Sequence, residues 1–597
     1  MTQANPADHE LIEPTKIVSI TMRDGETLYA ALFLPKEPGR YPTLFAASPY
    51  RFDNDYAPAY PMYLWRETGP VAWYVDHGYA FLHMDVRGTG RSGGEYRFLD
   101  EVEQHDLYDA IEWIATQPWS DGNVGGIGQS YYAVMQWFMA IQSPPHLKCI
   151  APYDGLIDVY RASAFSGGIP GEFFNLWYNQ LLRPINQYPA HGPSRELPWD
   201  MPYVARHHTT YDEFWKERAA AEQLDKIKVP VYSIGLWTKV DLHLNGNIVG
   251  YQRIGAPKKL LLLGTSNLYA AVSDFSSVAF HEKFLLPFYD HYLKGRQTPY
   301  LKEPNVRYFV GGADEFKTAD TWPPAHVGYQ AFYLKRGPSG SITSLNDGAL
   351  DAAGPDRDSA PTRFDYPNPG WRAGVVGFDA DGRPDPSRRV LTFTTAPLIG
   401  DIEIAGPIKL VLYAASTNCD TDFVVKLYDQ APQSPDRRTK DIQPSSRVVT
   451  KGWLRASHRA VDPKRSTEYA LWYTHADPQP LEPGTVTKIE VAVMPTAYRF
   501  KKGNRIRIDL ANGDSGLTEF GWFHHEYTPD KLGQDTIFHS EQYPSQILLP
   551  VVRQGANVAQ HAGRRRARIF GSKPGHHVRP PVVAGRGVES GPATDGR

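Results

Sequence analysis

The sequence has few cysteines, no long apolar run and no excess of basic residues, and each absence excludes a class of protein. Its two cysteines, Cys149 and Cys419, lie far apart, so neither a disulfide framework nor a thiolate metal site is expected. Lys and Arg number 63 against 66 Asp and Glu, a net charge of -3, which provides no basic footprint for nucleic acid. No stretch approaches the roughly 18 uninterrupted apolar residues of a membrane span, and no secretory signal opens the chain. We therefore expect a cytoplasmic protein.

The first half of the chain alternates strand patterns with helix patterns, which is typical of a parallel α/β sheet. Residues 17–34 are typical of a hairpin with Asp24 and Gly25 in its turn, and further strands are "PTLFAASPY", "AFLHMDV" and "NVGGIG". Helical spacing follows in "HDLYDAIEWIATQPW" and "QSYYAVMQWFMAIQS". A chain of 597 residues is too long for one folding unit, so several domains are expected.

Five segments describe the expected organisation. Residues 1–157 and 226–297 form the two parts of an α/β domain, because the alternation stops between them and resumes at "VPVYSIGLW". The aromatic and Pro-rich residues 158–225 are expected to form a mostly helical insertion. Residues 298–552 contain short strands separated by Pro, Gly and Asp turns, which favours an all-β sandwich or jelly roll. Residues 553–597 have few large apolar side chains, so a disordered tail is expected.

The stretch "VGGIGQSYYAVMQW" places Ser130 between a strand pattern and a helix pattern. In a nucleophile elbow such a turn lifts the serine out of the sheet, and small neighbours tolerate the strained backbone. Gly128 meets this need, whereas Tyr132 stands where a second glycine is usual. A serine also needs a base and an oxyanion hole before it can attack a carbonyl. Taken alone, the stretch also fits a Gly-rich turn with an incidental surface serine.

Longer stretches resemble the cocaine esterase and X-Pro dipeptidyl-peptidase family, which includes the α-amino acid ester hydrolases. The matching segments are "MDVRGTGRSGGEY", "DLYDAIEWIATQPWSDGNVGGIGQSYYAV", "DVYRASAFSGGIPGEFF", "FYDHYLKG", "IAGPIKLVLYAASTNCDTDFVVKLYD" and "GWLRASHR". The resemblance implies an α/β-hydrolase domain with a helical cap insertion and a C-terminal all-β jelly-roll domain. It also implies Ser-dependent acyl transfer from esters and amides to water, without a metal or organic cofactor.

Carried over by position, the resemblance makes Ser130 the nucleophile and forms the oxyanion hole from the backbone N–H of Tyr131 and the hydroxyl of Tyr50, in "SPYRF". The acid of the family's triad is missing, because Thr238 follows Gly-Leu-Trp in "SIGLWTKVDLHLNGN". Asp241 is the nearest carboxylate. It is a substitute triad acid, a ligand for the substrate, or a polar residue at a helix start.

The family's histidine is missing too. Its segment is "LLLLGTSNLYAAVSDF" here, with Leu268 at the histidine position and Tyr269 beside it, and neither is an effective base at neutral pH. Histidines that could replace it are the candidate relocated bases His243 and His281, and then His524 and His525 of the β domain. By itself each of them is more typical of a packed core or surface histidine.

These residues support three hypotheses. The first is a serine hydrolase that acts on an ester or amide bond of a small, hydrophobic molecule, with Ser130 activated by a relocated base. The second is a repurposed α/β-hydrolase that catalyses cyclisation, isomerisation, elimination or acyl transfer, with Ser130, Tyr50 and Asp241 as polar groups. The third is an inactive binding protein. We rank hydrolysis first, narrowly above the repurposed enzyme.

The aromatic-rich insertion favours an apolar or aromatic small-molecule substrate, although the same side chains also suit simple packing onto the core. The expected substrate-binding residues are Phe165, Phe173, Trp177, Trp237, Thr238, Leu268 and Tyr269. We expect no partnership with nucleic acid, membrane, metal or cofactor. The sequence is compatible with a homo-oligomer.

Overall fold

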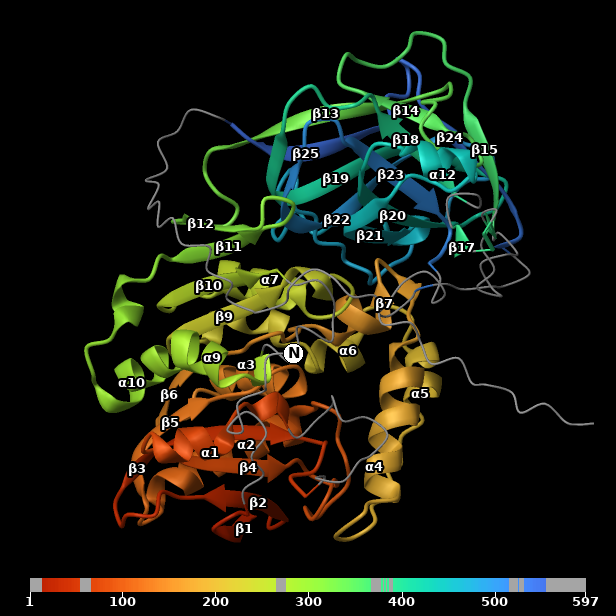
Figure 1. Ribbon diagram of the computed structural model, residues 1–597. Helices are drawn as coiled ribbons and strands as arrows, with labels where there is room; N and C mark the ends of the chain where they lie inside the picture. The colour runs from red at the N-terminus through yellow and green to blue at the C-terminus, as the bar shows by residue number, and fades with distance from the viewer. Residues whose placement is uncertain are drawn as a thin grey trace, which may run out of the picture. The chain divides into compact units, whose positions relative to one another are not determined.

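The chain forms two large β-sheets, one surrounded by helices and one almost without them (Figure 1). The computed structural model describes residues 13–53, 66–264, 275–366, 377–378, 381–382, 384–385, 390–514, 524 and 531–553. The sequence-based expectations for Leu268, Tyr269, His525 and the tail beyond Arg553 lie outside the described residues. All described residues belong to one compact unit.

The first sheet has ten strands and holds the serine motif. In spatial order they are β1 (Lys16–Thr21), β2 (Thr27–Phe33), β4 (Ala80–Asp85), β3 (Tyr41–Ser48), β5 (Ser120–Gly126), β6 (Leu147–Ile150), β9 (Val231–Leu236), β10 (Lys258–Leu263), β11 (Val306–Val310) and β12 (Glu315–Ala319). Pairing is parallel from β4 through β11 and antiparallel at both edges. Because helices flank this mostly parallel sheet, strands β4 and β9 are buried along their whole length.

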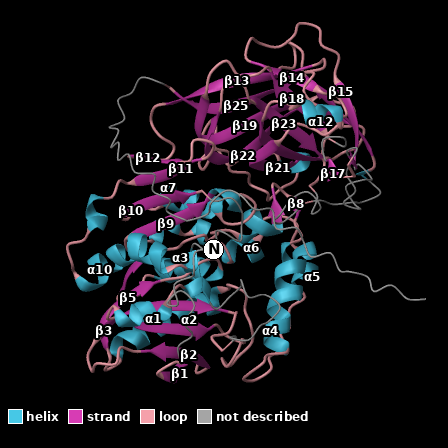
Figure 2. Cartoon of the chain, in the orientation of Figure 1, coloured by secondary structure: helices cyan, strands magenta, loops and turns pink. Residues whose placement is uncertain are grey.

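The helices gather around this first sheet, as the cyan ribbons of Figure 2 show. They are α1 (Val71–Asp76), α2 (Glu101–Thr116), α3 (Tyr131–Gln142), α7 (Leu244–Arg253), α9 (Val278–Phe280), π-helix η8 (His281–Leu285) and α10 (Leu286–Lys294). Helix α2 begins where the side chain of Asp100 accepts hydrogen bonds from the N–H groups of Val102 and Glu103. No helix in the ranges that the structure describes is long and apolar enough to cross a membrane.

Residues 158–225 are mostly helical, as the sequence indicates. They contain the π-helices η3 (Tyr160–Ala164) and η4 (Phe174–Leu182), a small hairpin of β7 (Phe165–Ser166) and β8 (Ile169–Pro170), the helices α4 (Arg183–Gln187), α5 (Met201–His207) and α6 (Glu213–Glu217), and two short 3₁₀ turns. Their aromatic side chains pack into the core of the first sheet. That this segment acts as a cap over the site stays a prediction.

The second sheet has eleven strands and its own apolar core. In spatial order they are β15 (Thr362–Tyr366), β24 (Gly533–Phe538), β19 (Ile402–Ser416), β22 (Thr487–Phe500), β21 (Ser446–Arg455), β20 (Asp422–Gln430), β23 (Arg505–Ala511), β18 (Leu391–Thr395), β14 (Gly348–Asp351), β13 (Val327–Lys335) and β25 (Gln546–Val552). Strand β19 also pairs with β25, so the sheet folds back on itself. The C-terminal part is thus all-β, while the jelly-roll strand order stays a prediction.

Strand pairing extends the first sheet past the expected domain boundary at residue 298. Strand β11 pairs parallel with β10, and β12 pairs antiparallel with β11, so the first sheet continues to Ala319. A short strand between turns has the same sequence pattern in either sheet. Only its hydrogen-bonded neighbour, which the sequence does not show, decides to which sheet it belongs.

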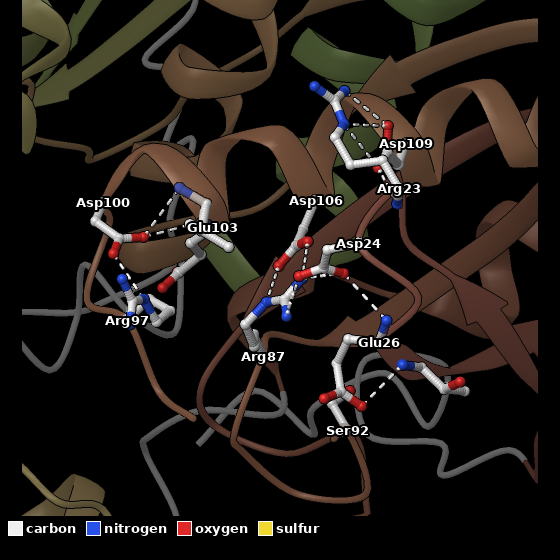
Figure 3. A network of polar contacts seen from close by, with 12 residues as sticks. Arg23, Asp24, Glu26, Arg87, Ser92, Arg97, Asp100, Glu103, Asp106 and Asp109 are labelled. Atoms are coloured by element: carbon white, nitrogen blue, oxygen red, sulfur yellow. Dashed lines mark hydrogen bonds and ion pairs between the residues drawn. The ribbon is translucent and has the colours of Figure 1, made fainter. Parts of the chain in front are cut away.

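A buried ion pair ties the N-terminal hairpin and helix α2 to the loop after β4 (Figure 3). Two guanidinium nitrogens of Arg87, Nε and Nη2, donate to the carboxylate of Asp106, at 2.9 and 2.6 Å. Asp24, in the hairpin turn, lies 2.8 Å from Arg87 Nη1. Closer to the surface, Arg23 pairs with Asp109 one turn further along α2. This network fixes the loop after β4 between the hairpin turn and helix α2.

Candidate active site

Ser130 occupies the turn between β5 and α3, the placement expected from the sequence. Its backbone has φ +58° and ψ −121°, a conformation that a residue with a side chain adopts only under strain. The turn is held from outside, because Ser130 N–H donates to the carbonyl of Asp154 at 2.9 Å and Gln129 N–H donates to that of Glu67 at 2.7 Å. The strained turn therefore depends on two other segments of the chain.

The departure from the usual elbow at Tyr132 has a structural explanation. Gly128 has φ +126°, and a Cβ built there would lie 2.3 Å from the Cβ of Tyr132. The Tyr132 side chain is fully buried, and its hydroxyl lies 2.9 Å from His83 Nε2. Tyr132 thus fills the space beside the turn, and Gly128 provides the room that it needs.

Asp154 is the centre of a buried polar cluster beside this turn. One carboxylate oxygen, Oδ2, accepts a hydrogen bond from Gln129 Nε2 at 2.9 Å and lies 3.5 Å from Lys239 Nζ. The other, Oδ1, lies 3.1 Å from His243 Nδ1. Burial alone raises the pKa of the Asp154 carboxyl, but Lys239, His243 and the Gln129 bond together hold it well below its usual range. Asp154 is therefore a carboxylate at neutral pH.

His243 is the imidazole of this cluster. Burial lowers its pKa from the usual 6.5, and the neighbouring carboxylate of Asp154 offsets only part of that effect. The ring is therefore neutral at neutral pH and can accept a proton. Among the described residues, no imidazole is hydrogen-bonded to Ser130 Oγ.

Both ring nitrogens of the other candidate base, His281, already have hydrogen-bond partners. His281 Nδ1 lies 2.9 Å from the hydroxyl of Tyr74, and its Nε2 lies 2.8 Å from the carbonyl oxygen of Phe275. Burial lowers the pKa of His281 to about 3. The structure places it as a core histidine that joins α1 to η8.

Asp241 and Thr238 lie in the segment that carries the triad acid in the family. The carboxylate of Asp241 is directed to strand β21, with Oδ2 3.8 Å from Lys451 Nζ. Thr238 Oγ1 is buried and has no hydrogen-bond partner within the part of the chain that the structure describes. The carboxylate that contacts an imidazole here is thus Asp154 rather than a residue of this segment.

Three members of the cluster were not foreseen from the sequence: Asp154, Lys239 and Glu67. Burial raises the pKa of the Glu67 carboxyl to about 8, despite the nearby Lys239. A signal for Asp154 did exist, because it follows a short apolar strand in "KCIAPYDG". The carboxyl ends of neighbouring parallel strands meet at one edge of a sheet, where ligands bind in α/β proteins. The positions of Lys239 and Glu67 give no comparable signal.

Tyr50, the second expected arm of the oxyanion hole, lies against both tyrosines that follow Ser130. Its ring meets those of Tyr131 and Tyr132 edge-on, with centroids 5.9 and 6.0 Å apart. Its hydroxyl accepts a hydrogen bond from Trp177 Nε1 at 2.9 Å. Trp177 stacks on Tyr131, and Phe173 also stacks on Trp177, at centroid distances of 6.0 and 5.3 Å. A column of aromatic rings from η4 thus ends beside the nucleophile turn.

The other expected substrate-binding residues are packed elsewhere. Trp237 donates from Nε1 to the carbonyl of Phe309 and packs against Trp322, so it belongs to the core between the first sheet and β22. Phe165 stacks on Tyr160 within the inserted segment. Of the expected set, the structure brings Phe173 and Trp177 close to the Ser130 turn.

A mostly parallel sheet with a strained serine between a strand and a helix, followed by an all-β domain, defines a two-domain α/β hydrolase. Comparison with known proteins agrees. The model of the X-Pro dipeptidyl-peptidase (S15 family) matches residues 24–267, and that of the X-Pro dipeptidyl-peptidase C-terminal non-catalytic domain matches residues 301–548. The chain therefore belongs to the X-Pro dipeptidyl-peptidase family of hydrolases.

Individual relatives support the same conclusion. Cocaine esterase from Rhodococcus sp. is 26% identical over 608 residues, which covers 90% of this chain and 98% of that enzyme. A CocE/NonD family hydrolase from Staphylococcus aureus has a TM-score of 0.73 at 26% identity, covering 90% of this chain and 93% of the other. A solved α-amino acid ester hydrolase has a TM-score of 0.67 at 21% identity, covering 90% and 96%, and shares the fold.

Proposed function

We propose that the protein is a serine hydrolase that cleaves an ester or amide bond of a small, apolar molecule, with Ser130 as nucleophile. The observation that carries the proposal is the buried pair of His243 and Asp154 beside the serine turn. The two side chains approach within 3.1 Å, and the backbone oxygen of the same Asp154 accepts the Ser130 N–H. Another part of the sheet edge thus supplies the imidazole and carboxylate that the family's usual positions lack.

In this mechanism His243 takes the proton of Ser130 Oγ as the oxygen attacks the substrate carbonyl. Asp154, with Oδ1 3.1 Å from His243 Nδ1, balances the imidazolium charge, and His243 then protonates the leaving group. The Tyr131 N–H and the Tyr50 hydroxyl bind the oxyanion. The imidazole has to turn toward Ser130 when substrate binds. Catalytic hydrogen bonds are often long or misaligned before the substrate complex forms.

The aromatic column supports an apolar acyl group as the part of the substrate that is recognised. Phe173, Trp177 and Tyr131 stack at the end of helix α3 that carries Ser130. Large flat rings bury apolar area with little loss of side-chain entropy. An acyl chain that lies along this column would present its carbonyl to the serine turn.

Turnover of p-nitrophenyl butyrate tests the proposal. We expect Ser130→Ala and His243→Ala each to lower kcat/KM by about 10³-fold or more, because each removes a member of one catalytic unit. The matched control is His146→Ala, at a half-exposed histidine that pairs with Glu112, and it should retain full activity. Retention of activity within about threefold in His243→Ala would overturn the assignment of the base.

A second candidate function is a non-hydrolytic step on a small molecule. The buried Thr238 hydroxyl at the position of the family's acid favours it, because the usual relay is absent there. In that case Ser130 acts as a hydrogen-bond donor to the substrate. Ser130→Ala would then slow the native reaction by only about 5- to 150-fold, the effect of one hydrogen bond.

A further inference from the structure

We infer that Trp177, from the inserted segment, is a positioning residue that orients both arms of the oxyanion hole. The inference rests on the proposed function, because it concerns the Tyr50 hydroxyl and the Tyr131 N–H as donors to the substrate. Trp177 contacts both tyrosines, and it lies on a different element from either of them.

The hydrogen bond to Tyr50 fixes the direction of the Tyr50 proton. An indole nitrogen is only a donor, so in the 2.9 Å contact the phenol oxygen is the acceptor. The Tyr50 O–H must then be directed away from the indole. Accepting a hydrogen bond also polarises a hydroxyl and makes it a stronger donor. Trp177 and Tyr50 are both buried, so water competes little for this contact.

The stacking contact fixes the second arm. The ring of Trp177 lies nearly parallel to that of Tyr131, with an interplanar angle of 15°. Phe173 also stacks on the Trp177 ring, with an interplanar angle of 10°. The Tyr131 hydroxyl is held as well, since it donates to Glu103 Oε1 at 3.1 Å and lies 3.2 Å from the hydroxyl of Tyr96. A ring that is held at its face and at its hydroxyl leaves the adjoining backbone N–H little freedom.

The inserted segment also holds the backbone beside Tyr50. Asn186, in α4, donates from Nδ2 to the carbonyl of Pro49 at 3.1 Å and accepts from the N–H of Gly90 at 3.0 Å. The peptide that leads into Tyr50 is therefore anchored by α4, while its hydroxyl is anchored by η4. The nine-residue π-helix η4 is an uncommon element, and π-helical turns are frequent at functional sites.

A double-mutant cycle tests the inference. Trp177→Phe removes the indole N–H and keeps an aromatic ring, so we expect kcat on p-nitrophenyl butyrate to fall about 5- to 30-fold with KM nearly unchanged. Tyr50→Phe should lower kcat further than Trp177→Phe does. In the Tyr50→Phe background, Trp177→Phe should have less than about a twofold effect, because its target hydroxyl is gone. The matched control is Trp119→Phe, which precedes β5 at the end opposite Ser130.

Two outcomes would overturn the inference: independent effects of Trp177→Phe and Tyr50→Phe, or a rise in KM with unchanged kcat, which would show that Trp177 acts only as a binding contact for the acyl group and does not orient the oxyanion hole. Phe173→Leu is the second variant if Trp177→Phe does not fold. It loosens the stack that holds Tyr131, so it should lower kcat in both the wild-type and the Tyr50→Phe background. Failure of the proposed function is distinguishable, since Ser130→Ala would then retain turnover whatever happens at Trp177.

Discussion

At the scale of single residues, the site depends on how three ionisable groups, Lys239, His243 and Glu67, are arranged around Asp154. The carboxylate is fully buried, and such a group persists only when it is paired and hydrogen-bonded. Lys239 supplies the positive charge, while His243 and Glu67 are kept neutral by burial. The neutral imidazole can therefore accept a proton at neutral pH, and the neighbouring ammonium opposes a second positive charge.

The acid limb of the pH profile follows from this arrangement. His243 must be neutral to act as base, and burial, opposed by Asp154 and reinforced by Lys239, lowers its pKa below 6.5. Activity should therefore fall only as the pH drops through a value below about 6.5. Lys239→Met removes a cation that disfavours the imidazolium, so the pKa of His243 should rise and the acid limb should move to higher pH.

The measurement is kcat/KM for p-nitrophenyl butyrate from pH 4.5 to 8. Lys216→Met, at a half-exposed lysine in α6, removes the same charge far from Asp154 and should leave the profile unchanged. An acid limb in Lys239→Met that coincides with that of the wild type would contradict the charge arrangement.

The position of Ser130 could be predicted from the sequence, whereas the pairing of Asp154 with His243 could not, for a physical reason. The serine turn is local, because a strand, small residues and a helix follow one another within a few positions. The partner of His243 comes from a different strand, and that contact exists only once β5, β6 and β9 are side by side. Asp241 was chosen from the sequence because it is the carboxylate nearest to Thr238 in the chain. In the fold its carboxylate is directed to Lys451.

At the scale of elements, the hairpin, the loop after β4 and helix α2 depend on one buried cation. Asp106→Asn would leave Arg87 with only the half-exposed Asp24 as its ionic partner in the network of Figure 3. Removing one partner of a buried pair costs roughly 3–5 kcal/mol, and the remaining Asp24 contact should keep the loss near the lower value.

Urea unfolding of Asp106→Asn checks this expectation. The matched control is Asp109→Asn, one turn further along α2, because its partner Arg23 is half-exposed. Exposed pairs contribute about 1 kcal/mol or less. Equal losses in the two variants would show that the buried pair does not hold these elements.

Elements were easier to predict than their partners. The alternation of strands and helices in the first half and the short strands of the second half follow from hydrophobic spacing and turn residues, and the structure confirms an α/β part followed by an all-β part. Which strands pair is a nonlocal property, so β11 and β12 could not be assigned to the first sheet from their sequence.

At the scale of the whole molecule, one buried arginine, Arg161, contacts both the insertion and the all-β part. Arg161 pairs with Asp158 at 2.5 Å and donates to the carbonyls of Tyr473 and Thr474. Its guanidinium also lies over the ring of Trp472. Arg161→Met should lower the free energy of unfolding by roughly 3–5 kcal/mol, because it leaves the Asp158 carboxylate buried without a cation.

The urea midpoint of Arg161→Met should therefore fall well below that of Arg296→Met, the control at a surface pair with Asp290. In the control the arginine is 61% exposed and the loss should stay within about 1 kcal/mol. A midpoint for Arg161→Met equal to that of the wild type would show that the contact does not link the two parts.

The central claim is that Ser130 is a nucleophile activated by His243 and Asp154, and covalent labelling tests it most directly. The wild-type protein would be incubated with a fluorophosphonate probe, and the adduct followed by intact mass and located by peptide mapping. We predict one probe per chain, on Ser130, and labelling at least about 10³-fold slower in His243→Ala. No adduct at Ser130, or equally fast labelling without His243, would contradict the account.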